Sequence, residues 1–155
     1  MLNHATNHTQ QRCAQAEKNR AEMKIKKLKE NYFGLTFLAT GKETSGKYFL
    51  SETIIPAGDN GPPIHVHSKE DEGFYLKKGN LTFIIDGKEI ELKEGEYLNI
   101  EKGEEHTWRN KTEFDAELLV TFVPAGIENM FKELEQNMSN IKKIGLKYGT
   151  DFQID

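Results

Sequence analysis

Cysteine, proline and long hydrophobic runs are all scarce in this sequence. It has one cysteine and four prolines in 155 residues. Because a single thiol, Cys13, cannot form an internal disulfide, the fold cannot depend on oxidation. No apolar run approaches the roughly 18 residues of a transmembrane helix, and residues 1–22 lack the apolar core of a signal peptide. We therefore expect a cytoplasmic protein without a membrane span.

An excess of positive charge is also missing. The chain carries 21 Lys and Arg against 25 Asp and Glu, a net charge of −4 at pH 7. Nucleic acids and anionic membranes are bound by clustered cationic surfaces. The densest basic run, KIKKLK at residues 24–29, is short and contains two apolar residues, and we interpret it as solvent-exposed. We expect a small-molecule partner, and neither a nucleic acid nor a membrane.

The length suits one domain with an N-terminal extension. A chain of 155 residues is too short for two domains of ordinary size. Residues 1–22 are rich in Asn, Gln, Thr and Ala, so they cannot bury enough apolar surface to offset their ordering entropy. We predict a disordered segment or a frayed helix over residues 1–22, a β domain over residues 23–124 and a helical segment over residues 125–155.

Short apolar runs separated by turn residues fill residues 33 to 123. The run LTFII is followed by Asp86-Gly87 and then by KEIELK, which is a strong hairpin signal. In KEIELK, Ile90 and Leu92 alternate with charged residues, as in a half-buried strand. Many short strands at such spacing predict an all-β fold, an antiparallel sandwich or barrel.

The hydrophobic period changes near the C-terminus. Apolar residues now recur at steps of three and four, which is typical of an amphipathic helix. These residues are Ile127, Met130, Phe131, Leu134, Met138 and Ile141. The PAG sequence at residues 124–126 predicts the helix start, and Ser139-Asn140 can divide the segment into two helices. We expect this segment to pack on the sheet; an alternative is that it also closes one mouth of a barrel.

Histidine and carboxylate residues gather near one strand-like run. Residues two apart on a strand point to the same face, so His65 and His67 can bind one metal ion. Glu72 follows after a short turn, and His106 lies in a later run, EKGEEHTWRN. An HxH pair alone occurs by chance on exposed strands, and a lone buried histidine is usually a hydrogen-bonded core residue. Three imidazoles and one carboxylate together favour a site for Fe, Mn, Ni, Zn or Cu.

Two stretches resemble the sequence motifs of the cupin superfamily. The first family motif has the form G-x5-HxH-x3,4-E-x6-G, and residues 65–79 match it with Glu72 at the glutamate position. The second has the form G-x5-PxG-x2-H-x3-N, and residues 95–110 match it with His106 at the histidine position. Glu101 replaces the proline of the second motif, and Gly58 lies one residue too far upstream for the first. Neither position is a ligand in the family, so these departures concern loop geometry.

The resemblance implies a fold and a ligand set. It extends from about residue 33 to residue 124, and GPPIHVHSKEDEGFYLKKG narrows it to single-domain bacterial cupins of the quercetin 2,3-dioxygenase-like type. The implied fold is a double-stranded β-helix (jelly-roll) barrel with C-terminal α-helices, often as a homodimer. FGLTFLAT and KYFLSETII offer apolar faces for such pairing. The family resemblance also implies that one metal ion is held by His65, His67, Glu72 and His106.

Other residues near the motifs have expected roles. Phe74 and Leu76 share the strand face of Glu72, and with Trp108 they are the apolar candidates for a substrate pocket. Glu72 is also the candidate general base. The neighbouring acidic residues are expected to be solvent-exposed: Glu70, Asp71, Glu104 and Glu105.

Three functions stay open at this point. The first is a metal-dependent dioxygenase acting on a small aromatic or enolisable substrate, which the quercetinase-like resemblance favours. The second is an isomerase or lyase that uses the ion as a Lewis acid. The third is a non-catalytic, small-ligand-binding cupin whose metal orients the ligand.

Overall fold

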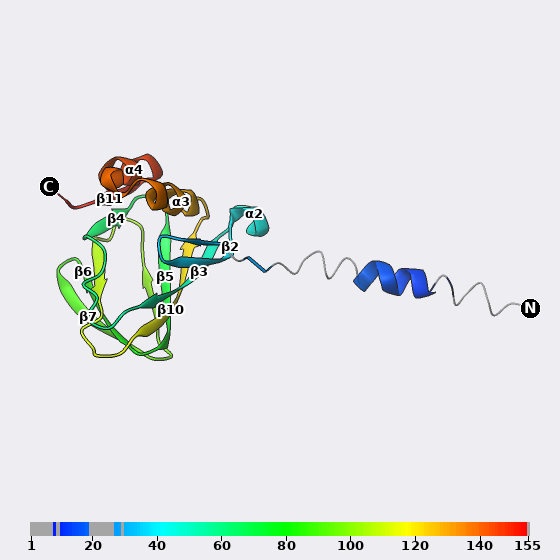
Figure 1. Cartoon of the computed structure of the whole chain (residues 1–155), viewed down its shortest axis with the longest axis horizontal. Coiled ribbons are helices and arrows are strands. Elements are labelled where there is room, and N and C mark those ends of the chain that lie inside the picture. The colour runs from blue at the N-terminus through cyan, green and yellow to red at the C-terminus, as the bar shows by residue number, and fades with distance from the viewer. Residues whose placement is uncertain (1–7, 9, 19–26, 29, 155) are drawn as a thin grey trace, which may run out of the picture.

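The computed structural model describes residues 8, 10–18, 27–28 and 30–154 (Figure 1). Two antiparallel sheets form a barrel, and helices from the C-terminal part of the chain lie over one end of it (Figure 1). Residue 8 and residues 10–18 are helical, and the other residues of the predicted extension lie outside the described part. No helix within the described ranges is long and apolar enough to cross a membrane.

The first sheet has six strands, and β10 lies near its centre. β10 pairs antiparallel with β3 on one side and with β5 on the other. In spatial order the strands are β1 (Asn31–Tyr32), β2 (Leu35–Ala39), β3 (Phe49–Ile55), β10 (Ala116–Val123), β5 (Asp71–Lys78) and β8 (Tyr97–Ile100). Burial alternates along β10 as expected for a strand with one face in the core.

The second sheet has five strands. In spatial order they are β11 (Thr150–Phe152), β4 (His65–His67), β9 (His106–Arg109), β6 (Asn80–Ile85) and β7 (Lys88–Lys93). The inner faces of both sheets supply a phenylalanine-rich core, in which Phe49 packs on Phe37 and Phe122 with ring centroids 4.6 and 5.8 Å apart. The predicted all-β fold with C-terminal helices is therefore confirmed.

The predicted hairpin is present, but one of its residues is more exposed than expected. Asp86 and Gly87 both have positive φ, at 47° and 77°, and connect β6 to β7 as a two-residue turn of this kind requires. Leu92 is buried as predicted, whereas Ile90 is 43% exposed. β7 is the edge strand of its sheet, so no further strand lies beside it to cover Ile90.

A one-turn helix occupies the predicted turn GKETSG. This helix, α2, spans Gly41–Thr44 and was not expected from the sequence. Thr40 and Glu43 form a capping box. The Glu43 carboxylate accepts the backbone N–H of Thr40, and the Thr40 hydroxyl accepts a backbone N–H of the first helical turn. The short polar segment can form this turn because its own side chains satisfy the free N–H groups.

The C-terminal segment divides as the sequence allowed. Helix α3 covers Glu128–Gln136, a 3₁₀ turn covers Met138–Asn140, and helix α4 covers Ile141–Tyr148. The chain then returns as β11, which was not predicted and which pairs antiparallel with β4. The buried residues Met130 and Leu134 attach α3 to the core. This returning strand brings the C-terminal segment to the predicted metal ligands.

Candidate metal centre

Three histidines gather on two neighbouring strands. β4 is only three residues long, and its alternating burial places His65 and His67 inside the barrel. β9 runs antiparallel beside β4, and the register pairs His65 with His106. The ring centroids of the three histidines are 4.3 to 5.4 Å apart. The strand geometry alone therefore brings three imidazoles together.

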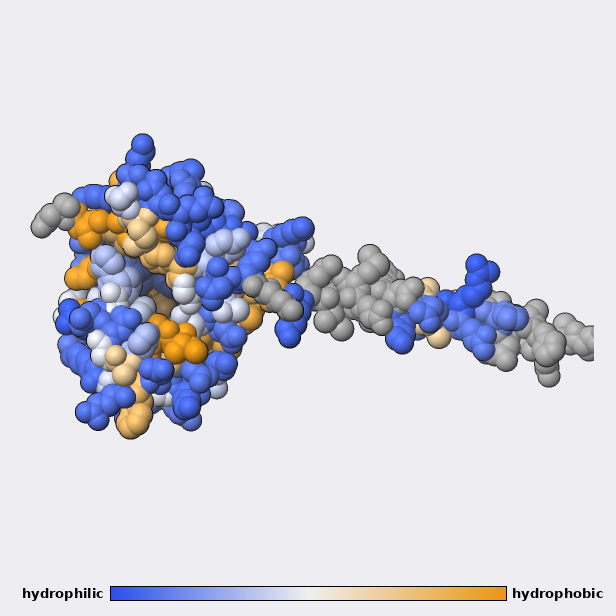
Figure 2. All heavy atoms as spheres, in the orientation of Figure 1, coloured by the Kyte–Doolittle hydropathy of each residue, from blue (hydrophilic) through white to orange (hydrophobic). Residues whose placement is uncertain are grey.

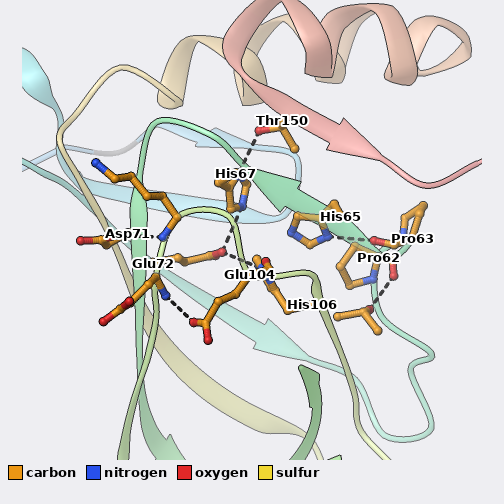
Figure 3. Close-up of polar contacts among 12 residues, drawn as sticks. Pro62, Pro63, His65, His67, Asp71, Glu72, Glu104, His106 and Thr150 are labelled. Carbon is orange, nitrogen blue, oxygen red and sulfur yellow. Dashed lines mark hydrogen bonds and ion pairs between the residues drawn. The ribbon is translucent and has the colours of Figure 1, made fainter. Parts of the chain in front are cut away.

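Glu72 reaches these histidines from the opposite sheet. It lies on β5, whereas β4 and β9 belong to the second sheet. Its Oε2 lies 3.1 Å from His67 Nε2 and 3.0 Å from His106 Nε2 (Figure 3). Ligand atoms of His65, His67, Glu72 and His106 all lie within 4.8 Å of one another, and all four residues are buried. The structure thus brings together the four residues that the sequence predicted as metal ligands.

The Nδ1 atom of each histidine, called its outer nitrogen below, lies within hydrogen-bond distance of an oxygen. His65 Nδ1 lies 2.8 Å from the Pro63 carbonyl, and His106 Nδ1 lies 3.0 Å from the Glu104 carbonyl. A carbonyl can only accept a hydrogen bond, so both Nδ1 atoms carry the proton. In His65 the Nε2 lone pair is then free to face the centre of the group. His67 Nδ1 differs because its partner is the hydroxyl of Thr150, at 2.8 Å.

The environment sets the charges of these groups. Burial pushes the pKa of Glu72 upward, but its contacts with His106 and His67 outweigh this effect and hold the pKa at about 2. Burial, together with the neighbouring His106 and His67, lowers the pKa of His65 to about 4. The pKa of His106 is raised, because the Glu72 carboxylate outweighs burial. At neutral pH Glu72 is therefore ionised and His65 is neutral, which are the forms that bind metal.

This donor set fits a divalent transition metal. His67 Nε2 is buried and has no hydrogen-bond partner, although it lies 3.1 Å from Glu72 Oε2. A buried polar atom without a partner is costly, and a bound ion would satisfy it. Imidazole and carboxylate ligands suit Fe, Mn, Ni, Zn and Cu, and they do not choose among these ions.

A pocket of about 700 Å³ leads to the ligands. His65, His67 and Glu72 are part of its lining, and most of the remaining lining residues are aliphatic or aromatic. Figure 2 shows a hollow in the barrel with hydrophobic residues around it. A second pocket, of about 570 Å³ beside α2 and α3, contains none of the four ligands. The first pocket therefore joins the candidate metal centre to a space large enough for an organic ligand.

Two of the three predicted wall residues line this pocket. Phe74 and Trp108 belong to its lining. Leu76 is fully buried in the barrel core and lies outside the lining. Residues beyond the barrel motifs also contribute, among them Met138 and Phe152 from the C-terminal segment.

Comparison with known proteins places the chain in a family. Residues 51–122 match the protein family described as Cupin domain. Quercetin 2,3-dioxygenase of Bacillus subtilis (strain 168) is 29% identical over 97 residues, which are 63% of this chain and 28% of that enzyme. The chain therefore contains a cupin domain.

Two solved structures show the same cupin fold at low sequence identity. A predicted oxalate decarboxylase from Thermotoga maritima has a TM-score of 0.55 and 24% identity, covering 58% of this chain and 78% of that one. A sugar phosphate isomerase of the cupin superfamily from Silicibacter pomeroyi has a TM-score of 0.51 and 21% identity, covering 59% and 60%. The three relatives carry different reaction names, and this cupin spans less than a third of the dioxygenase. Its activity must therefore be argued from the site.

One acidic neighbour of the cupin ligands is buried, which the sequence analysis did not expect. Glu70 is 4% exposed, and its Oε2 has no hydrogen-bond partner. Burial raises the pKa of this carboxyl. The turn that carries it is enclosed because the Gly103 N–H bonds the His67 carbonyl and the Ser68 N–H bonds the Gly149 carbonyl.

The other three acidic residues are half-buried rather than fully exposed. Asp71 accepts the backbone N–H of Lys102, and Glu104 accepts that of Glu101. These loops also support the ligands, since the Glu104 carbonyl is the partner of His106. The expectation of solvent exposure was wrong for Glu70, which is buried, and Asp71, Glu104 and Glu105 are only partly exposed.

Proposed function

We propose that this protein is a metal-dependent dioxygenase acting on a small, uncharged aromatic or enolisable substrate. The observation that carries the proposal is the pocket, because its apolar walls end at the histidine and carboxylate group. The similarity to quercetin 2,3-dioxygenase supports the same reaction class.

The charges of the pocket favour an uncharged substrate. No lysine or arginine is among the described residues that line it, and Asp59 and Glu72 are its carboxylates. A phosphate or carboxylate away from the metal would lose its hydration without meeting a cation, which is costly. Aromatic walls such as Phe74 and Trp108 instead suit a flat, apolar molecule. This argues against sugar phosphates as substrates.

The four ligand residues would bind the ion, and Glu72 would also accept a proton. His65, His67, His106 and Glu72 would hold the ion, which when bound supplies redox chemistry and positive charge for an anionic oxygen of the substrate. Glu72 is ionised at neutral pH and can accept a proton at Oε2. A carboxylate is a weak base, so the proton it accepts must come from an acidic hydroxyl. An enol or phenol meets this requirement better than an alcohol.

The pocket walls exclude water from the ligand group. Phe152 packs on His65 with ring centroids 5.5 Å apart, and Phe122 packs on His67 at 5.6 Å. Electrostatic interactions are stronger where water is excluded. The aromatic shell therefore strengthens the contact between a bound ion and an anionic substrate oxygen.

Oxygen uptake by metal-loaded protein tests the proposal. Protein loaded with iron, manganese, nickel, copper or zinc is mixed in an oxygen electrode with flavonols, catechols and diketones. We expect uptake with at least one redox metal, and at least tenfold less uptake with the same aromatic core carrying a phosphate. No uptake with any metal and substrate would favour the non-catalytic binding function. Uptake that is undiminished by the phosphate would contradict the charge argument.

Variants separate the two roles assigned to Glu72. Glu72→Gln should lose turnover and keep much of its metal, whereas His106→Ala should lose most of its metal. Glu70→Gln is the matched control, because Glu70 is a buried carboxyl two residues before Glu72 that does not belong to the ligand group. A Glu72→Gln protein with full turnover would rule out Glu72 as the base.

A further inference from the structure

One ligand histidine is held differently from the other two. The outer nitrogens of His65 and His106 bond carbonyls only two residues away in the sequence. The outer nitrogen of His67 bonds the side chain of Thr150, 83 residues away (Figure 3). Two ligands are therefore oriented by their own loops, and the third is oriented by a tertiary contact.

The register of β11 fixes this contact. Thr150 pairs with His67 and Phe152 pairs with His65, so alternate residues of β11 face the two ligands. Thr150 is completely buried. Backbone hydrogen bonds close both ends of the pairing, from Ser68 to Gly149 at 2.8 Å and from Gln153 to Ile64 at 2.7 Å. The hydroxyl of Thr150 is thus held in place by the strand and cannot turn away to solvent.

We propose that Thr150 is a positioning residue of the metal centre. When an ion is bound, the Thr150 hydroxyl would accept the Nδ1–H of His67 and keep the Nε2 lone pair directed toward the centre of the ligand group. The residues that match the cupin family end at 122, so this contact comes from outside the matched domain. The inference rests on the metal site of the proposed function and not on its dioxygenase reaction.

The physical reason lies in the needs of a metal-bound imidazole. A histidine that binds metal through one nitrogen carries its proton on the other and requires an acceptor there. Without the hydroxyl, the Nδ1–H of His67 would be buried and unsatisfied, and the ring would lose its orienting contact. Loss of such a partner typically costs about 10- to 100-fold in metal affinity. For His65 and His106 no side-chain substitution removes the acceptor, because it is a backbone carbonyl.

The zinc affinity of three full-length variants tests the proposal. Thr150→Val keeps the β-branched shape and removes the hydroxyl, so we expect about 10- to 100-fold weaker Zn²⁺ binding in competition with a chelator. Thr150→Ser restores the hydroxyl and should return the affinity to within about threefold of wild type. Thr107→Val is the matched control, because Thr107 is also buried on this sheet and its hydroxyl bonds the Pro62 carbonyl instead of a histidine.

A spectroscopic measurement separates positioning from a general loss of structure. In the ¹⁵N-edited NMR spectrum of Zn²⁺-loaded wild type, the Nδ1–H of His67 should be protected from exchange with water. The signal should broaden or disappear in Thr150→Val and return in Thr150→Ser, while the signals of His65 and His106 persist in all three proteins.

The outcomes are distinct for this inference and for the proposed function. Equal Zn²⁺ affinity in wild type and Thr150→Val overturns the role of Thr150 and leaves the metal site standing. An equal loss in Thr107→Val also overturns it, because the effect would then not depend on His67. Wild-type protein that binds no Zn²⁺ overturns the metal site and this inference together. Binding without oxygen uptake contradicts only the dioxygenase reaction.

Discussion

At the scale of single residues, two ligands connect the stability of the metal-free protein to pH. The pKa of His65 is about 4 in the fold against an ordinary value of 6.5. As the pH falls from 6.5 to 4, the unfolded chain takes up a proton at His65 that the folded chain does not, so the free energy of unfolding falls. The pKa of Glu72 is about 2 against 4.5, so its stabilising contribution is present above pH 4.5 and is lost toward pH 2.

His106 acts in the opposite direction and in a different pH range. Its raised pKa means that its contribution is complete below pH 6.5 and is lost as the pH rises through the folded value. Urea unfolding of metal-free protein between pH 6.5 and pH 4 should therefore show falling stability, with a smaller slope in His65→Asn. His8→Asn is the control, since His8 is exposed and outside the ligand group. The same slope in wild type and His65→Asn would show that His65 is not the group that titrates.

At the scale of elements, helix α4 and strand β11 pack unusually closely. A Cβ atom at Gly145 would lie 2.6 Å from the Thr150 carbonyl oxygen and 2.6 Å from Phe152 Cδ2. Alanine is about 1 kcal/mol better than glycine within a helix, but forcing an extra carbon into a packed site costs about 1–3 kcal/mol. One of the contacts is backbone and cannot rotate away, so we expect Gly145→Ala to be destabilising.

If the added carbon of Gly145→Ala pushes β11 away from α4, the shift should also reach the metal site. Since β11 carries Thr150, Gly145→Ala is expected to weaken Zn²⁺ binding as well as lower the melting temperature by several degrees. Leu146→Ala is a suitable comparison, because Leu146 is exposed on the same helix and should change neither property by much. A Gly145→Ala protein with a higher melting temperature would show that helix propensity outweighs the contact.

The sequence predicted the elements whose signals are local. Alternating residues, the Asp86-Gly87 turn and the two histidines of β4 depend on neighbours a few positions away, and these features could be derived in advance. The exposure of Ile90 depends on which strand lies at the edge of a sheet. The burial of Glu70 depends on a loop and on a glycine distant in the sequence. Three residues of β11 show no periodic pattern, so Thr150 could not be found from sequence alone.

At the scale of the whole molecule, the expected homodimer stays a prediction. FGLTFLAT and KYFLSETII contribute the neighbouring strands β2 and β3, and Ile54 on β3 is well exposed. Burying such side chains between two copies would be favourable. Light scattering at micromolar concentration should give about twice the monomer mass of 17.8 kDa. A measured mass near that of one chain would contradict the prediction.

The position of β11 also has a consequence for synthesis. Ribosomes make proteins from the N-terminus, so β11 emerges after every other strand of the described chain. Until then β4 has β9 on one side and nothing on the other. An unpaired strand edge is a template for pairing with other chains. A nascent chain that stalls before residue 150 therefore carries two metal-binding histidines on an open edge, where it is most prone to aggregate.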